Sequence, residues 1–214
     1  MEFKHSTSRQ DYESALEFME TRVGGIRAKE KDEMVWFLEH PSLYTAGTSA
    51  KEADLLDARF PVYKAGRGGE YTYHGPGQRV CYVMLDLKKR QNVPDIKKYV
   101  WQLEEWIIKS LASFDINAER RDGRIGIWVI DQLGREAKIA ALGVRVRHWV
   151  SYHGVAINVN PELSHFNGII PCGISEYGVT SMSALLGREV ELDELDQALK
   201  HNWYQIFPDQ ALAA

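Results

Sequence analysis

Residues 125–160 read IGIWVIDQLGREAKIAALGVRVRHWVSYHGVAINVN, and this stretch decides the fold. It contains three runs rich in β-branched and aromatic residues, at 125–130, 137–147 and 149–160. The polar segment DQLGRE separates the first two runs, and a tight connection near His148 separates the last two. Runs of this composition bounded by short turns are typical of neighbouring antiparallel strands. The sequence therefore predicts a three-stranded meander.

A second pair of strands is predicted upstream, on either side of a glycine-rich loop. Residues 60–87 read FPVYKAGRGGEYTYHGPGQRVCYVMLDL, with five glycines between the two apolar ends. The pattern predicts a strand, a loop, and then a strand in which alternate residues from Val80 onward face opposite sides. Cys81 is expected to lie in the middle of that strand.

Helical periodicity flanks these strands. Residues 12–22 place apolar side chains three and four positions apart with acids between them, and residues 96–114 repeat the pattern over a longer span. Residues 34–40, MVWFLEH, form a short apolar run that is typical of a buried strand ending before Pro41. We therefore expect two helices that pack on a sheet.

The last part of the chain is predicted to be irregular and then helical. Residues 161–174 carry proline and glycine at both ends. Residues 179–186 and 193–207 show helical spacing, with Asp193 as the expected N-cap. No repeat or linker interrupts the chain, so we expect one α+β domain over residues 1–214.

Length and composition exclude several classes of protein. Of the 214 residues, 44% are hydrophobic and 26% are charged, as in an ordinary globular domain with one sizeable core. The formal net charge of -4 argues against a protein that coats nucleic acid. No apolar stretch has the length of a signal peptide or membrane span, so we expect a cytoplasmic protein without a membrane partner. Two cysteines are too few for a disulfide framework, and we expect a monomer.

Cys172 lies between a rigid proline and a glycine, in the segment IIPCGI at 169–174. This setting presents a side chain at a loop tip and lets a substrate approach the backbone. A thiol reacts as the thiolate, which needs a nearby positive charge or base. The alternative is that Cys172 is a small buried hydrophobe, as unpaired cysteines often are.

Lys138 opens the run KIAALGVRVR, in which apolar and β-branched residues follow it. One interpretation is that its stem lies on the strand while its amine reaches solvent. The other is that its amine is partly desolvated, holds a thiolate and relays protons. Nothing local in residues 138–147 decides between the two.

The loop RGGEYTYHGPGQ, residues 67–78, is a candidate ligand-binding segment. Its exposed backbone amides can wrap a ligand, and His74 can act as a hydrogen-bond donor or as a base. The loop is not a Walker loop, since no Gly-Lys-Ser/Thr follows, and it lacks the dinucleotide-binding G-x-G-x-x-G pattern. A wide turn between two strands explains the same glycines.

His153 precedes Gly154 in a predicted strand, where a missing side chain allows another backbone or a ligand to come close. We interpret His153 either as a core residue with satisfied hydrogen bonds or as a catalytic group. We assign no metal site, because four other histidines show no metal-ligand spacing. They are His40, His148, His165 and His201.

Three motifs occur in a fixed order along the chain. They are RGG followed by TYHGPGQ at 67–78, KIAALGVRVRHWVSYHGVAINVNP at 138–161, and the PCG cysteine at 171–173. In order and spacing they resemble the lipoyl/octanoyl transferase family, also called lipoate-protein ligase B. The likeness runs from HPSLYTAG at 40–47 to IIPCGI and so covers most of the chain. It implies the fold of biotin and lipoate ligase catalytic domains, a mixed β-sheet with packed helices.

The resemblance also implies roles for individual residues. Cys172 is expected to be the acyl-thioester nucleophile and Lys138 its catalytic partner. A narrow tunnel would hold the saturated chain, whose burial contributes about 0.8 kcal/mol per methylene. The residues expected to form this substrate pocket are Arg67, Gly68, Gly69, Glu70, Tyr71, Thr72, Tyr73, His74, Ala141, Leu142, Gly143, Gly154, Val155 and Ala156.

The activity implied by the resemblance is octanoyl transfer in lipoate biosynthesis. Octanoyl-acyl carrier protein would be the donor, and lipoyl domains of 2-oxoacid dehydrogenase complexes and glycine cleavage protein H the acceptors. No cofactor or ATP is expected, since conversion of a thioester to an amide is downhill. Three alternatives stay open: an ATP-dependent lipoate-protein ligase of the same fold, a Cys172–His153 thiol hydrolase, and a non-catalytic acyl-carrier-binding module.

Overall fold

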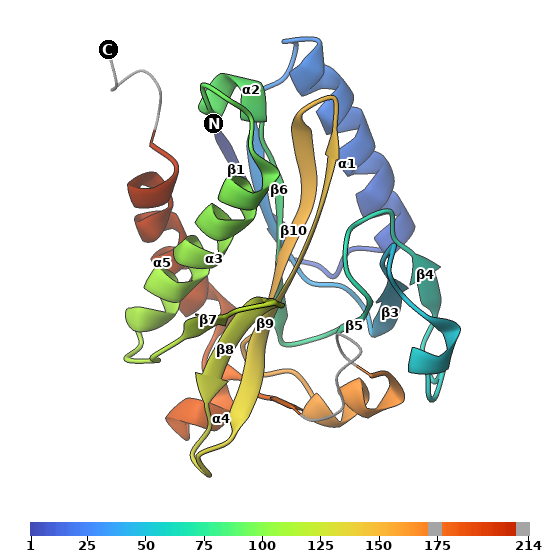
Figure 1. Cartoon of the computed structure of the whole chain (residues 1–214), viewed down its shortest axis with the longest axis vertical. Coiled ribbons are helices and arrows are strands. Elements are labelled where there is room, and N and C mark those ends of the chain that lie inside the picture. Colours follow the sequence, from blue (N-terminus) through green and yellow to red (C-terminus); the bar gives the residue numbers. More distant parts are fainter. Residues whose placement is uncertain (171–176, 209–214) are drawn as a thin grey trace.

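The main sheet has eight strands in the computed structural model, which describes residues 1–170 and 177–208 (Figure 1). Their order is β1-β2-β6-β10-β9-β8-β7, and β11 pairs with β9. The β1–β2 and β11–β9 pairs are parallel, and the other pairs are antiparallel. The strands span Glu2–His5 (β1), Met34–Leu38 (β2), Gln78–Met84 (β6), Glu119–Arg121 (β7), Arg124–Ile130 (β8), Glu136–Arg147 (β9), Val150–Asn158 (β10) and Gly178–Val179 (β11). The predicted meander is therefore confirmed as β8-β9-β10.

A smaller sheet has the order β4-β3-β5 and lies beside the main sheet (Figure 1). Its strands are Leu43–Ala46 (β3), Val62–Lys64 (β4) and Tyr71–His74 (β5). β5 occupies the middle of the loop predicted at 67–78, so a third of that loop is a strand. The small sheet thus fixes the glycine-rich segment to the rest of the fold.

Helices cover both faces of the main sheet (Figure 1). α3 and α5 lie on one face, called here the core face, where the rings of Trp106 and Trp203 meet edge to face with centroids 4.9 Å apart. α1 and the small sheet lie on the opposite face, called here the site face. The helices span Tyr12–Arg27 (α1), Leu87–Arg90 (α2), Ile96–Ala112 (α3), Met182–Leu186 (α4) and Leu192–Ile206 (α5), with 3₁₀ turns at Glu52–Asp54 and Leu163–Gly168.

The predicted alternation along β6 is confirmed. Val80 and Tyr82 pack in the cluster under α1, whereas Cys81 and Val83 pack in the cluster under α3 and α5. Every residue of the strand is buried. Burial raises the pKa of the Cys81 thiol well above its usual range. Cys81 therefore packs as an apolar residue on the core face, and its side chain contributes no surface to the site face.

The predicted N-cap at Asp193 is wrong. α5 begins at Leu192, and Glu191 is its N-cap. The backbone N–H of Glu191 donates a hydrogen bond to Oε1 of Glu194 over 3.0 Å, as in a capping box. Asp193 instead lies in the first turn, where a carboxylate is also favourable because of the helix dipole. Acidic residues are favourable both at the N-cap and in the first turn, so the sequence alone does not distinguish Glu191 from Asp193 as the N-cap.

The predicted α+β class is confirmed, with differences at the ends of elements. α1 continues to Arg27, five residues past its predicted end. Val179 was expected to be helical and belongs to β11. Within the described ranges, no helix combines the length and the apolar composition that crossing a membrane requires.

Gly154 allows β10 and β6 to approach each other closely. The two strands pair through Gly154 and Tyr82. A Cβ added at Gly154 would lie 2.2 Å from the carbonyl oxygen of Cys81. A neighbouring backbone, and not a ligand, therefore occupies the space that the missing side chain leaves.

We expect Gly154→Ala to lower the free energy of unfolding by about 1–3 kcal/mol, because a clash with backbone cannot be relieved by a side-chain rotation. Gly24→Ala is the matched control, since a Cβ at Gly24 within α1 meets no described atom within 4 Å. That control should gain about 0.5–1 kcal/mol. Urea unfolding measures both changes, and equal stability of the two variants would contradict the close approach.

Candidate active site

The glycine-rich loop docks onto β9. The backbone N–H of Gly68 donates to the carbonyl oxygen of Val144 over 3.0 Å. A Cβ added at Gly143 would lie 2.7 Å from Cδ of Arg67 and 3.0 Å from the carbonyl oxygen of Gly68. The fit requires the glycine at 143, so two segments about 75 positions apart in the chain form one surface.

Arg67 ties this loop to the small sheet. Its side chain is buried, and its guanidinium donates to the carbonyl oxygens of Thr45, Gly68 and Glu70 at 3.1, 2.9 and 3.2 Å. It also donates to Oγ1 of Thr45 at 2.7 Å. Arg67 is thus an internal anchor of the loop that places positive charge next to β9.

The two predicted triplets on β9 and β10 are cross-strand partners. Ala141, Leu142 and Gly143 pair with Ala156, Val155 and Gly154. Ala156 packs under α1 on the site face, and its partner Ala141 shares that face because paired residues project to the same side. Val155 belongs to the core face, and Leu142 packs against the same cluster. Leu142 and Val155 therefore contribute only backbone to the site face.

A β-bulge in β9 turns Lys138 toward the site face. The pairing with β8 passes from Ala140 directly to Lys138, so Ile139 has no partner on that strand. Ala137, Ile139 and Ala140 all pack in the core-face cluster. In a regular strand Lys138 and Ala140 would share a face. The extra residue breaks this alternation, so the Lys138 side chain projects to the site face while Ala140 projects to the core face.

Lys138 is buried, which excludes the interpretation that its amine reaches solvent. Its side chain is only 7% exposed. Nζ lies 5.2 Å from the ring centroid of Trp128, within reach of a cation–π interaction. A Cβ added at Gly126 would lie 2.3 Å from Cε of Lys138 and 3.0 Å from Nζ. The absence of a side chain at Gly126 therefore makes room for the lysine.

Three histidines that are far apart in the sequence meet under α1. His40, His74 and Tyr82 lie side by side, with ring centroids 5.8 Å apart for both His40 pairs. His153 has a positive φ of 59°, and its ring lies 5.9 Å from that of Tyr82. Only His74 and His153 were candidates from the sequence. No group of three or more candidate ligands that could hold a metal ion occurs in the described part of the chain.

Burial keeps these histidines neutral. It is the main reason why the pKa of His153 is lowered to about 3 and that of His40 to about 4. Burial, together with the nearby Arg67 guanidinium, holds the pKa of His74 well below its usual range. At neutral pH each ring therefore has one N–H and one free lone pair to share.

His153 is not the satisfied core histidine that one interpretation expected. Its Nε2 is buried and has no hydrogen-bond partner among the described residues, and the same holds for the hydroxyl of Tyr12. Tyr12 lies next to His40, with ring centroids 5.6 Å apart. Orphaned polar atoms of this kind are rare in native proteins and call for a partner. Each of these two atoms can therefore share a hydrogen bond with a polar group that binds at the site face.

Cys172 lies outside the described residues, as do its neighbours Pro171 and Gly173. The described chain resumes beside Lys138. The ring of Tyr177 lies 5.5 Å from that of Trp128, the indole over which Lys138 extends. Val179 on β11 is the direct strand partner of Lys138.

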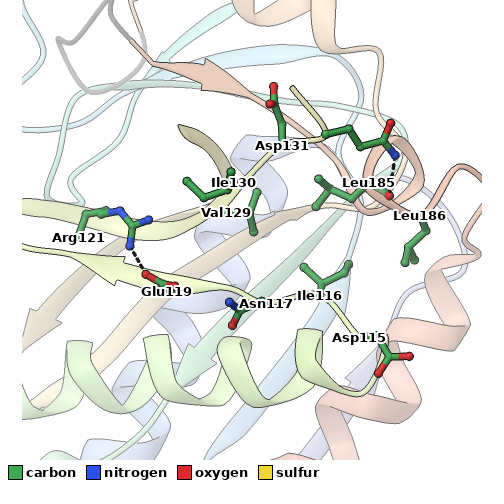
Figure 2. A pocket seen from close by; sticks show the side chains of 11 residues that line it. Asp115, Ile116, Asn117, Glu119, Arg121, Val129, Ile130, Asp131, Leu185 and Leu186 are labelled. Atoms are coloured by element: carbon green, nitrogen blue, oxygen red, sulfur yellow. Dashed lines mark hydrogen bonds and ion pairs between the residues drawn. The ribbon is translucent and has the colours of Figure 1, made fainter. Parts of the chain in front are cut away.

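Two cavities lie beside the end of β8. The one in Figure 2 measures about 260 Å³ and lies between β7, β8 and α4, with Arg121, Val129 and Leu186 among its walls. The other measures about 670 Å³ and is lined by residues that flank Lys138, among them Ala137 and Val179. None of the predicted substrate-binding residues lines either cavity.

The neutral histidines predict a pH-dependent stability. Above about pH 6.5 they are neutral in both states, but as the pH falls below it the unfolded chain binds protons that the folded protein excludes. We therefore expect the free energy of unfolding to fall between pH 6.5 and 5, by up to about 1.4 kcal/mol per pH unit for each buried histidine. His153→Gln should make this slope shallower, and urea titrations at several pH values measure it. An unchanged slope in the variant would contradict the assignment to His153.

Comparison with known proteins places the chain in a family. It matches the family described as lipoyl protein ligase A/B catalytic domain over residues 11–203. It is 57% identical over 208 residues to a protein of Paramagnetospirillum magneticum named octanoyltransferase, covering 97% of each chain. A protein of Maricaulis maris with the same name is 59% identical over 199 residues, covering 92% of this chain and 87% of that one.

Among solved structures, the crystal structure of lipoate-protein ligase A bound with ATP has a TM-score of 0.72 at 15% sequence identity, covering 96% of this chain and 85% of that one. At that identity the likeness concerns the fold, and it confirms the predicted lipoate-ligase architecture. Because the family match spans most of the sequence, the chain belongs to the lipoyl protein ligase A/B catalytic domain family.

Proposed function

We propose that this protein is an octanoyltransferase of lipoate biosynthesis and that residues 1–214 act as a single catalytic domain. It takes an octanoyl group from octanoyl-acyl carrier protein onto Cys172 and passes it to the ε-amine of a lysine. The high identity to relatives named octanoyltransferase supports this activity. The observation that carries it is the buried amine of Lys138, held on the site face by the bulge in β9.

The position of Lys138 supports a partnership with Cys172. Cys172 lies five positions before Tyr177, so the chain between them reaches at most about 18 Å. Tyr177 contacts the same indole as Lys138, and Val179 pairs with Lys138 itself. The reach of this segment is thus compatible with contact between the thiol and the amine.

In the first step the Cys172 thiolate attacks the carbonyl carbon of the donor thioester. The bond from that carbon to Cys172 forms, and the bond to the carrier sulfur breaks. The carrier sulfur leaves as a thiol after it takes a proton from the ammonium group of Lys138. Before transfer, that ammonium charge stabilises the thiolate in a site with little water.

In the second step a neutral lysine amine attacks the Cys172 thioester. The carbon–nitrogen bond forms, and Lys138, now a neutral amine, accepts the proton that the nitrogen loses. Cys172 leaves as the thiolate, which restores the starting pair. No net charge is created over the cycle, and the thioester supplies the free energy for the amide.

The proposed acceptors are the lipoyl domains of 2-oxoacid dehydrogenase complexes and glycine cleavage protein H. Membership in a family that contains lipoyl protein ligases supports this class of acceptor. We propose further that the enzyme works as a cytoplasmic monomer.

The purified protein should modify a lipoyl domain from octanoyl-acyl carrier protein without ATP, and it should not attach free octanoate when ATP is present. The mass of the lipoyl domain reports the transfer. Modification only from octanoate and ATP would favour a ligase instead. Steady release of octanoate without acceptor would favour a thiol hydrolase, and carrier binding without either reaction would favour a binding module.

Gly126→Ala should slow octanoyl transfer by about a hundredfold, because the added Cβ must displace the Lys138 amine and small misplacements of a reacting group are costly. Gly123→Ala is the matched control: both glycines have positive φ, but a Cβ at Gly123 meets no described atom within 4 Å. Gly126→Ala also adds backbone strain, since the φ of 132° at Gly126 is less accessible to L residues than the 71° at Gly123, so the thermal stability of both variants is measured alongside their transfer rates. Equal rates would contradict the placement of Lys138.

A further inference from the structure

A row of buried amides joins His74 to the strand of Lys138. Gln78 on β6 and Asn158 on β10 are strand partners, and both side chains are almost fully buried. Nε2 of Gln78 donates to Oδ1 of Asn158 over 3.0 Å, and Nδ2 of Asn158 donates to the carbonyl oxygen of Thr180 over 3.0 Å. The N–H of Thr180 donates in turn to the carbonyl oxygen of Lys138 over 3.0 Å.

Two backbone carbonyl groups determine which way both amides point. A carbonyl oxygen can only accept, so Asn158 must turn its NH₂ group to Thr180 and its oxygen to Gln78. Nε2 of Gln78 also donates to the carbonyl oxygen of Tyr73 over 3.2 Å. Flipping either amide would place two acceptors face to face in a buried site, which is strongly unfavourable. The row therefore has one orientation.

That orientation reaches the ring of His74. With both N–H groups of Gln78 engaged, its Oε1 faces Nδ1 of His74 at 2.7 Å. Oε1 is an acceptor, so Nδ1 must carry the proton. In a neutral ring the other nitrogen, Nε2, then has a lone pair and no hydrogen.

We propose that Gln78 and Asn158 are positioning residues that hold His74 as its Nδ1–H tautomer, so that Nε2 of His74 acts only as a hydrogen-bond acceptor in the reaction. The inference rests on the proposed octanoyl transfer for its role in catalysis. His74 then cannot donate its ring hydrogen to the oxyanion. It can accept an N–H from the incoming lysine amine and orient that nitrogen for attack.

The tautomer is relevant to only one of the two chemical steps. The reacting atoms of the donor thioester have no N–H to offer to Nε2, whereas the acceptor amine has two. Loss of the Gln78 oxygen should therefore leave formation of the Cys172 thioester close to the wild-type rate. Its discharge to the lipoyl domain should slow by about tenfold or more, since a histidine in the wrong tautomer is a poor catalyst.

His40 provides an internal control. Its Nδ1 lies 2.6 Å from the carbonyl oxygen of Gln10 and its Nε2 lies 2.7 Å from the hydroxyl of Tyr82. The carbonyl oxygen requires the same Nδ1–H tautomer, but no residue of the amide row takes part. A substitution at Gln78 or Asn158 should therefore leave the tautomer of His40 unchanged.

The test is a long-range ¹H–¹⁵N correlation spectrum of the ring nitrogens in histidine-labelled protein at neutral pH. In wild type, His74 and His40 should both show the Nδ1–H pattern. Gln78→Met should shift His74 toward the Nε2–H form and leave His40 unchanged. Gln91→Met is the matched control, since Gln91 is a buried glutamine whose Oε1 accepts from the backbone N–H of Asp95. Gln91→Met should change neither the tautomer of His74 or His40 nor the rate at which the thioester is discharged.

An Nε2–H pattern for His74 in wild type would overturn the proposal without any variant. So would a Gln78→Met protein whose His74 tautomer or thioester discharge equals that of wild type. If no thioester forms on Cys172 even in wild type, the proposed function fails while the spectrum still decides the tautomer.

Discussion

The bulge at Ile139 in β9 is the constraint on which the candidate site depends. It allows two successive residues to pack in the core and sends Lys138 to the other side of the sheet. The lysine can lie there because β8 has no side chain at Gly126. On the same strand, Gly143 and Val144 receive the loop that carries Arg67. One irregular strand therefore carries the buried amine of Lys138 and, five residues further along, the docking position of the glycine-rich loop.

The site face combines buried positive charge with neutral rings. Arg67 and Lys138 are both almost fully buried, and burying a cation is costly unless polar groups surround it. For Arg67, hydrogen bonds to carbonyl and hydroxyl oxygens offset much of the desolvation free energy. The histidines nearby add no charge at neutral pH, because burial lowers the pKa of His40 and His153 far below 7. Such a site favours reactions in which negative charge develops, as on a thiolate or on a tetrahedral oxyanion.

Periodicity predicted the elements that are regular. The meander, β6 with its two-sided alternation and α3 all follow from apolar spacing, since each buries a face at its own period. The bulge at Ile139 leaves no recognisable mark in the apolar spacing of the sequence. An extra residue in β9 can be recognised only when its pairing with β8 is known. The tyrosine that meets His40 is 42 positions away in sequence, and Asn158 is 80 positions from Gln78. Motif resemblance supplied the proposed roles of Cys172 and Lys138, whereas the burial of Lys138 is visible only in the structure.

Cys172 is proposed to carry the acyl group with the assistance of Lys138. Intact-protein mass spectrometry after mixing with octanoyl-acyl carrier protein tests this proposal most directly, using wild type, Cys172→Ser and Lys138→Ala. We predict an octanoyl adduct on wild type that hydroxylamine removes and that both variants lack. Transfer to a lipoyl domain by a wild-type protein that never acquires the adduct, even in rapid-quench samples, would contradict the covalent mechanism.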